Sequence, residues 1–173
     1  RLENNLKEYE ICGTIIISSE GVNGTISSKK DKLLKFNKLL KKILSIKKFN
    51  SENNSNSKFN PFHKPKVKIK KEVVPMGFKV RNYNYPSNNL NPRQWNKIIK
   101  KKDTVLIDAR KSFEYDVGTF KKSLNPNIEN FRQFPKYLNQ FKNSENIAMF
   151  CTGGIRCEKA NIYLKKKGFK NVY

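Results

Sequence analysis

Two kinds of hydrophobic pattern alternate along the first half of the chain. Residues 12–18, Cys-Gly-Thr-Ile-Ile-Ile-Ser, form a short β-branched run that is typical of a buried strand. Leu33, Phe36 and Leu40 instead recur at helical spacing, with lysines on the opposite face. By these criteria we predict the end of a helix at 2–9, strands at 12–18 and 25–28, a helix at 30–46 and a strand at 66–74.

The connection between the first two predicted strands is short and contains the pair Asn23-Gly24. This pair tolerates the positive φ that tight hairpin turns require, so we predict the turn within residues 19–24. Helix, hairpin, helix and strand in this order predict a small α+β domain over residues 1–75. We expect it to be ferredoxin-like, with the first strand of that fold missing.

A second domain follows a segment of different composition. Residues 76–91 contain Gly77, Pro86 and five asparagines, which is typical of a linker. Beyond it, the pattern predicts helices at 92–100, 130–141 and 157–167, and strands at 105–107, at 147–150 and from 171 onward. Strands that alternate with helices predict a parallel α/β sheet over residues 92–173.

Polar and reactive side chains follow two strands of this predicted sheet. Asp108 comes directly after the strand at 105–107, and Cys151 follows the strand at 147–150. In parallel sheets the active site lies beyond the carboxyl ends of the strands. We therefore expect both residues at one site.

Cys151 is the candidate catalytic residue. It opens a loop formed by Thr152, Gly153, Gly154, Ile155 and Arg156, and a helix follows that loop. Backbone N–H groups converge on such a position and the positive end of the helix dipole points at it, which favours the reactive thiolate. The alternative interpretation is a buried, inert cysteine. Cysteine-based phosphatases place five residues between cysteine and arginine, whereas this loop has four, so it suits one sulfur or oxygen atom on Cys151 better than a phosphate.

Three further residues are expected to support the site. Asp108 and Arg110 can hold the loop through charge-assisted hydrogen bonds. Cys157 falls on the inward side of the predicted helix, so we expect a packed thiol. It can alternatively resolve an oxidised or persulfurated Cys151. With one histidine and no Cys-x-x-Cys pair, we expect no metal site.

The net charge and the number of cysteines indicate the kind of partner and the cellular compartment. The 173 residues carry a net charge of +23, from 37 basic and 14 acidic residues, which favours contact with nucleic acid. An AT-rich genome also encodes many lysines and asparagines, so both explanations of the charge stay open. An odd number of cysteines, three, indicates a reduced, cytoplasmic protein. The sequence contains no apolar run long enough for a membrane span and no secretory segment, so we expect no membrane partner.

Several motifs together resemble a known family. Asp108-Ala109-Arg110 and the cysteine loop are similar to a rhodanese domain. The segments 19–25 (SEGVNGT), 118–120 (GTF) and 151–159 (CTGGIRCEK) more specifically resemble the tRNA uridine hydroxylase family. That resemblance spans essentially all 173 residues and implies a ferredoxin-like N-terminal domain followed by a rhodanese domain.

The resemblance also implies a function. Members of the family hydroxylate the wobble uridine of certain tRNAs to 5-hydroxyuridine, with molecular oxygen as co-substrate and no other cofactor that we can identify in this sequence. The implied catalytic residue is Cys151, often described as a persulfide carrier, and the implied partner is the anticodon region of tRNA. The chain begins at Arg1 and stops at Tyr173, so we expect a fragment that lacks the family's first strand and its C-terminal extension. Two alternatives remain: a rhodanese-type sulfurtransferase and a non-catalytic RNA-binding fragment.

Overall fold

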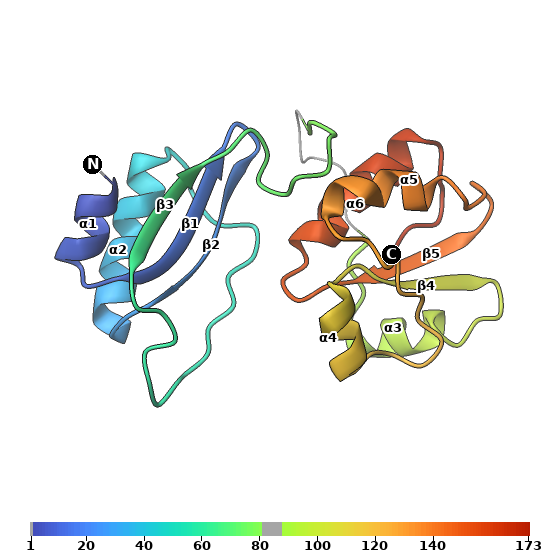
Figure 1. Cartoon of the computed structure of the whole chain (residues 1–173), viewed down its shortest axis with the longest axis horizontal. Coiled ribbons are helices and arrows are strands. Elements are labelled where there is room, and N and C mark those ends of the chain that lie inside the picture. The colour runs from blue at the N-terminus through green and yellow to red at the C-terminus, as the bar shows by residue number, and fades with distance from the viewer. Residues whose placement is uncertain (1, 81–87) are drawn as a thin grey trace. The chain divides into compact units, whose positions relative to one another are not determined.

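The chain folds into two compact units that meet at the peptide between Val73 and Val74. The structure is a computed structural model that describes residues 2–80 and 88–173 (Figure 1). None of the helices in these two ranges is both long enough and apolar enough to traverse a membrane.

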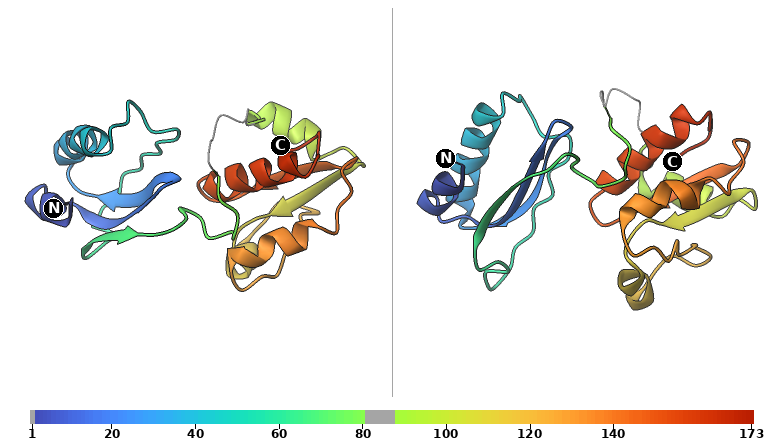
Figure 2. Two further views of the ribbon diagram at one scale, coloured as in Figure 1. Left: turned by 90° about the horizontal axis from the view of Figure 1, so that it is seen from above. Right: turned by 45° about the horizontal axis from the view of Figure 1, so that its top comes forward.

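The first unit is a three-stranded sheet with two helices. Its elements are α1 (Leu2–Glu8), β1 (Cys12–Ser18), β2 (Gly21–Ser27), α2 (Lys30–Ile43) and β3 (Pro65–Ile69). The central strand β1 pairs antiparallel with β2 and parallel with β3. Both helices lie on one face of the sheet (Figures 1 and 2). The predicted α+β domain is therefore confirmed.

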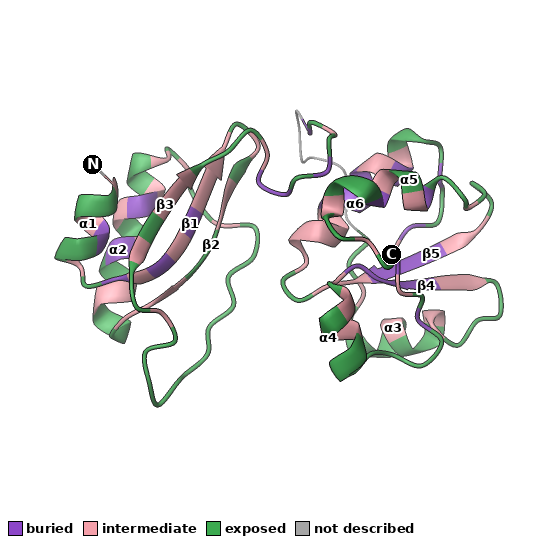
Figure 3. Cartoon of the chain, in the orientation of Figure 1, coloured by how far each residue is buried: buried purple, intermediate pink, exposed green. Residues whose placement is uncertain are grey.

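The core of this unit lies between the helices and that face of the sheet. Leu6 of α1, Ile15 of β1, and Phe36 and Leu40 of α2 are buried together (Figure 3). Phe36 and Leu40 are four residues apart, so one face of α2 supplies both. The helical spacing in the sequence thus corresponds to the face that packs on the sheet.

The hairpin turn lies within the predicted residues 19–24, but the Asn23-Gly24 pair does not form it. The turn lies at Ser19 and Glu20, and Asn23 and Gly24 are inside β2, where Gly24 pairs with Ile15. A Cβ atom at Gly24 would lie 2.6 Å from the carbonyl oxygen of Thr14. Glycine at this position therefore permits the close approach of two strands rather than a turn.

The third strand is shorter than predicted, and the linker begins differently. β3 ends at Ile69 rather than at Val74. Of the expected linker at 76–91, residues 81–87 lie outside the described residues. Met76 is fully buried in the core of the second unit.

The second unit alternates helices and strands. Its elements are α3 (Pro92–Ile98), β4 (Thr104–Asp108), α4 (Ser112–Val117), the 3-10 helix η1 (Phe131–Gln133), α5 (Phe134–Leu138), β5 (Asn146–Phe150) and α6 (Ile155–Lys166). The strands β4 and β5 are parallel, and isolated parallel bridges at Leu124 and Val172 extend the sheet on its two sides. The predicted parallel α/β architecture is confirmed.

Several predicted helices have different bounds in the structure. Those expected at 30–46 and 92–100 end earlier, at Ile43 and Ile98. The expected helix at 130–141 is divided into η1 and α5, and it begins at Asn130, whose side chain accepts a hydrogen bond from the N–H of Arg132. The expected helix at 157–167 begins two residues earlier, at Ile155. Arg156 therefore lies in the first turn of α6 rather than in the loop before it.

Alternate residues of β4 and β5 point to opposite faces of the sheet. Ile107, Ile147 and Met149 pack with α5 and α6 in the main core. On the opposite face, Phe150 contacts Trp95 of α3 and Phe120. The carboxyl ends of both strands thus lie between a hydrophobic core and an aromatic cluster.

Candidate active site

Cys151 directly follows β5, and the loop after it leads into α6. Gly154 is the N-cap of this helix and has a φ of 80°, a conformation that glycine adopts without strain. The thiol therefore sits beside the N-terminal end of a 12-residue helix. The positive end of the helix dipole and the free N–H groups of the first turn both favour a negative charge there.

The sulfur of Cys151 is held as an anion. Its pKa is lowered from an ordinary value of 9.0 to about 5, chiefly because the Cys157 side chain donates a hydrogen bond to it. Burial opposes this shift. Hydrogen bonds from the backbone N–H groups of Cys157 and Arg156, and the charge of Arg156, add to it. At neutral pH the thiolate, which is the nucleophilic form, therefore predominates.

Cys157 remains protonated beside this anion. Its hydrogen bond to Cys151, burial, and the negative charge of Cys151 all raise the pKa of Cys157 well above the ordinary range. All three cysteines of the chain are free thiols. The arrangement is one thiolate stabilised by a neighbouring thiol.

Glu114 of α4 links the cysteine loop to the rest of the site. Thr152 Oγ1 donates a 2.8 Å hydrogen bond to Glu114 Oε1, and Arg156 Nη2 lies 3.7 Å from Glu114 Oε2. Arg156 Nη1 also donates to the carbonyl oxygen of Ala109 at 3.0 Å. Burial acts to raise the pKa of Glu114, but the hydrogen bonds from Thr152 and the Lys111 backbone and the charge of Arg156 outweigh it, so the pKa is lowered.

Asp108 and Arg110 form a second network at the end of β4. Two guanidinium nitrogens of Arg110 contact the buried Asp108 carboxylate, the shorter distance being 2.7 Å. Arg110 also donates to the carbonyl of Gly118 at 2.6 Å, and Thr119 Oγ1 donates to Asp108 at 2.9 Å. Burial raises the pKa of Asp108, yet the hydrogen bonds from Arg110 and Thr119 lower it overall. Within the described residues this pair fixes the turn at 118–119, whereas Glu114 is the residue that bonds to the cysteine loop.

An open cavity of about 400 Å³ lies against these groups. Its wall consists of Arg110, Glu114, Gly118, Thr119, Phe120, Phe150, Cys151 and Thr152. Phe120 and Phe150 meet edge to face with ring centroids 4.9 Å apart, and Trp95 packs on both from behind. The cavity thus combines one nucleophile, ionised polar groups and an aromatic surface.

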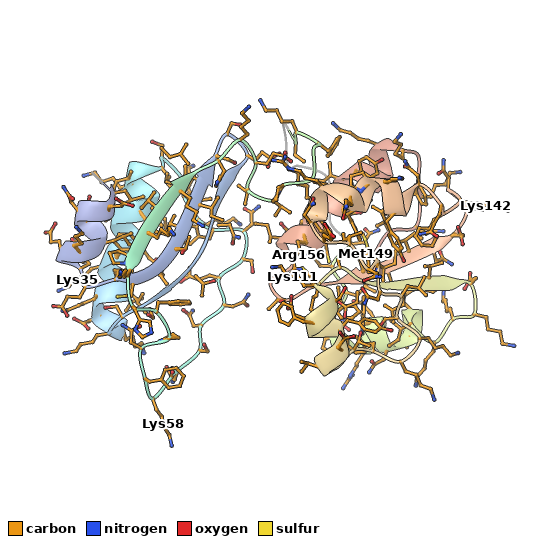
Figure 4. All side chains as sticks on the ribbon, in the orientation of Figure 1. Lys35, Lys58, Lys111, Lys142, Met149 and Arg156 are labelled. Carbon is orange, nitrogen blue, oxygen red and sulfur yellow. The ribbon has the colours of Figure 1, made fainter. Side chains whose placement is uncertain are left out.

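The structure brings together most of the site predicted from sequence. Cys151, Thr152 and Arg110 line the cavity, and the backbone N–H groups of Arg156 and Cys157 donate hydrogen bonds to the sulfur. Gly153 and Gly154 form the backbone of the loop, and Ile155 is the first residue of α6. Figure 4 labels Arg156 and Lys111 in the same region of the second unit.

Sequence reasoning missed the aromatic wall. Phe120 belongs to the Gly-Thr-Phe motif, which was the available signal for its position. Glu114 comes from a helix that only the tertiary fold places beside the loop. Among the described residues, no group of three or more metal-ligating side chains is assembled.

Family models match both units of the chain. The UPF0176 acylphosphatase-like domain matches residues 1–73, and the rhodanese-like domain matches residues 91–173. With the architecture described above, these matches confirm the predicted order of a ferredoxin-like α+β domain and a rhodanese-like α/β domain. A rhodanese-like domain protein from Staphylococcus aureus, solved as a crystal structure, aligns with a TM-score of 0.38 and 27% identity over 45% of this chain and 74% of that one.

Curated relatives match nearly the whole chain. The tRNA uridine(34) hydroxylase of Pelagibacter ubique (strain HTCC1062) is 61% identical over 172 residues, which are 99% of this chain and 57% of that protein. The protein of the same name from Prochlorococcus marinus (strain MIT 9312) is 46% identical over 96% of this chain and 56% of its own length. The chain therefore spans somewhat more than half the length of these relatives.

A third relative is matched over a larger share of its length. The tRNA uridine(34) hydroxylase of Legionella pneumophila (strain Corby) is 41% identical over 172 residues, which are 97% of this chain and 67% of that protein. The aligned range covers 97% of this chain and therefore extends into both units. On this evidence the chain belongs to the tRNA uridine(34) hydroxylase family.

Proposed function

We propose that the protein hydroxylates the wobble uridine of tRNA at C5 to give 5-hydroxyuridine, with molecular oxygen as co-substrate. One observation carries this proposal: in a chain of this family, the Cys151 thiolate faces an open cavity whose wall is partly aromatic. A nucleobase in the anticodon loop is single-stranded and can leave the stack, which chemistry on a base requires. The cavity offers such a base both a flat apolar surface and a nucleophile.

The partner in this proposal is the anticodon region of tRNA. The net charge of +23 supports binding to a polyanion. Lysines project from both units, among them Lys35, Lys58 and Lys142 (Figure 4). Three free cysteines fit the reducing cytoplasm, where we place the protein.

In this proposal, Cys151 is the reactive group and the other residues of the site orient the charged groups around it. Cys151 supplies the anion, and the N–H groups of Arg156 and Cys157 hold its charge in place. Glu114 fixes Thr152 and Arg156, and Asp108 fixes Arg110 at the cavity wall. Each charged group is thus oriented before the substrate enters, which reduces the reorganisation that the reaction requires.

Nucleoside mass spectrometry of tRNA tests this function. Cells that lack the gene are complemented with the wild-type gene, with Cys151→Ser, or with Cys12→Ser as a matched control in the first unit. We expect 5-hydroxyuridine with the wild type and with Cys12→Ser, and none above background with Cys151→Ser. Full modification in the Cys151→Ser strain would contradict a catalytic role of this residue.

A rhodanese-type sulfurtransferase is the second candidate function. The match of residues 91–173 to the rhodanese-like domain supports it. The backbone N–H groups that stabilise the Cys151 thiolate can also stabilise a persulfide on the same residue. Protein incubated with thiosulfate and then with cyanide would release thiocyanate in proportion to the Cys151 content. Protein that takes up no sulfur, in a strain whose tRNA is hydroxylated, would exclude this candidate and leave the first. RNA binding without either reaction would favour the third interpretation, a non-catalytic fragment.

A further inference from the structure

The cavity beside Cys151 is large enough to admit a pyrimidine ring. Its volume of about 400 Å³ is at the lower end of the range for small-molecule sites. Phe120 is 42% exposed, although its ring packs edge to face on both Trp95 and Phe150. An aromatic ring that two neighbouring rings hold in place and that stays partly exposed can serve as a platform on which a base stacks.

Two charged groups of the wall complement the edge of a uracil. Arg110 is held by Asp108 and by the carbonyl of Gly118, and its Nη1 atom has no hydrogen-bond partner among the described residues. That atom can donate to a carbonyl oxygen. Glu114 is ionised and can accept a hydrogen bond. Uracil presents a carbonyl at C4 beside an N–H at N3, whereas cytosine presents an amine and an unprotonated nitrogen. The pair therefore favours uracil over cytosine.

The remaining reactive group in the wall is the sulfur of Cys151. The C5=C6 bond of uracil is conjugated to the C4 carbonyl, so a nucleophile adds at C6 and the electron density appears at C5 and O4. A positive charge near O4 stabilises the resulting enolate. Arg110 supplies such a charge. The pKa of its guanidinium is raised chiefly by the hydrogen bond to Asp108, and the negative charge of Cys151 adds a smaller contribution in the same direction.

We propose that a flipped uracil stacks on Phe120, that Arg110 binds O4, and that Cys151 Sγ adds to C6 of the ring before C5 reacts. This proposal rests on the proposed function, because it takes the wobble uridine as the substrate. In the addition, a C–S bond forms, the C5–C6 π bond breaks, and its electron pair moves onto O4; a proton from water then joins C5. In the reverse step a C5 proton leaves to water, the C–S bond breaks and the thiolate returns. No oxidant or reductant takes part in either direction.

Hydrogen exchange at C5 tests the addition separately from hydroxylation. The protein is incubated without oxygen in deuterated water with an anticodon stem-loop RNA, and the nucleosides are analysed by mass spectrometry. We expect deuterium at C5 of the wobble uridine with the wild type and with the control Cys12→Ser, and none with Cys151→Ser. A second RNA with 5-fluorouridine at the same position should form a covalent adduct whose mass equals protein plus RNA.

A matched pair of variants tests whether the base stacks on Phe120. Because base stacking on an aromatic side chain contributes substantially to binding, Phe120→Leu should lower the rate of C5 exchange by roughly ten-fold or more. Phe113→Leu is the control, since Phe113 is exposed in the same unit and does not line the cavity. Equal rates for the two variants would overturn the stacking assignment.

The outcomes distinguish the two proposals. Hydroxylation in air that depends on Cys151, without C5 exchange and without an adduct, would overturn the addition and leave the proposed function in place. Exchange and adduct formation without hydroxylation would support the addition and count against the proposed function. The absence of all three activities would overturn both.

Discussion

At the scale of single residues, the site depends on two thiols with opposite protonation states. The hydrogen bond from Cys157 is the largest contribution to the low pKa of Cys151, and the same bond raises the pKa of Cys157. Cys157 therefore acts as a hydrogen-bond donor to the Cys151 thiolate in this structure. A disulfide between the two would remove that donor and the nucleophile together.

Replacement of Cys157 should shift the titration of Cys151 according to the donor that remains. We expect Cys157→Ala to raise the pKa of Cys151 by about one unit or more, because a charge-assisted hydrogen bond is lost. Cys157→Ser keeps an O–H donor and should raise it less. Thiolate absorbance at 240 nm against pH, measured in a Cys12→Ser background, gives both values. A pKa for Cys157→Ala equal to that of the parent would show that the N–H groups and Arg156 alone hold the anion.

The sequence predicted the residues of the cysteine loop because they are contiguous. Cys151 and Arg156 fall on a recognisable strand–loop–helix pattern, and local geometry then determines which N–H groups face the sulfur. Glu114 and Phe120 come from segments more than 30 positions away in the sequence. Their place at the cavity follows from packing of α4 and of the turn at 118–120 on the sheet, which a local pattern does not encode.

At the scale of elements, the N-terminus of α6 positions the backbone N–H groups that stabilise the Cys151 thiolate. Gly154 has a φ of 80°, whereas its neighbour Gly153 is not in the left-handed region. A Cβ atom would meet nothing within 4 Å at either position. Any difference between alanine substitutions at the two glycines therefore reports backbone strain rather than a clash.

Alanine substitutions at Gly153 and Gly154 should show how much the positive φ at residue 154 contributes to stability. Gly154→Ala is expected to lower the free energy of unfolding by about 1 kcal/mol, because non-glycine residues are disfavoured at positive φ. Gly153→Ala should change it by less than about 0.5 kcal/mol, as open surface positions do. Denaturant unfolding measures both. Equal stability of the two variants would mean that the helix begins without a left-handed residue at 154.

Element types were predicted more reliably than element ends. β1, β5 and α2 follow from long, regular hydrophobic patterns, and their predicted bounds agree closely with the structure. The Asn23-Gly24 pair was wrongly assigned to the hairpin turn, because the same two residue types suit both a turn and a close contact between strands. Lys159 is another residue that a pattern could not place: its side chain is fully buried in α6, with Nζ donating to the carbonyl of Val74 at 2.9 Å.

At the scale of the whole molecule, the excess positive charge is shared by both units. Residues 1–73 and 74–173 each contain a large surplus of lysine and arginine over aspartate and glutamate. On the open face of the first sheet, Lys66 and Lys68 of β3 stand in register with Thr14 and Ile16. Under the proposed function, phosphate contacts from both units would contribute to affinity for tRNA.

Binding to tRNA should weaken steeply as salt is added. Each neutralised phosphate releases counterions, so the logarithm of the affinity falls linearly with the logarithm of salt concentration. We expect a loss of about ten-fold or more between 50 and 200 mM salt for several such contacts. Fluorescence anisotropy with labelled tRNA measures the slope. An affinity that does not change over this range would show that the charge does not serve RNA binding.

The chemistry proposed for the site requires that the loop keep the sulfur of Cys151 anionic at neutral pH. The most direct measurement is the rate of iodoacetamide alkylation of Cys151 against pH, followed by peptide mass spectrometry so that Cys12 and Cys157 are counted separately. A thiolate fraction that rises through pH 5 and is complete by pH 7 is predicted, because the pKa lies at about 5. A midpoint between about pH 8 and 9, as for an ordinary thiol, would contradict the account.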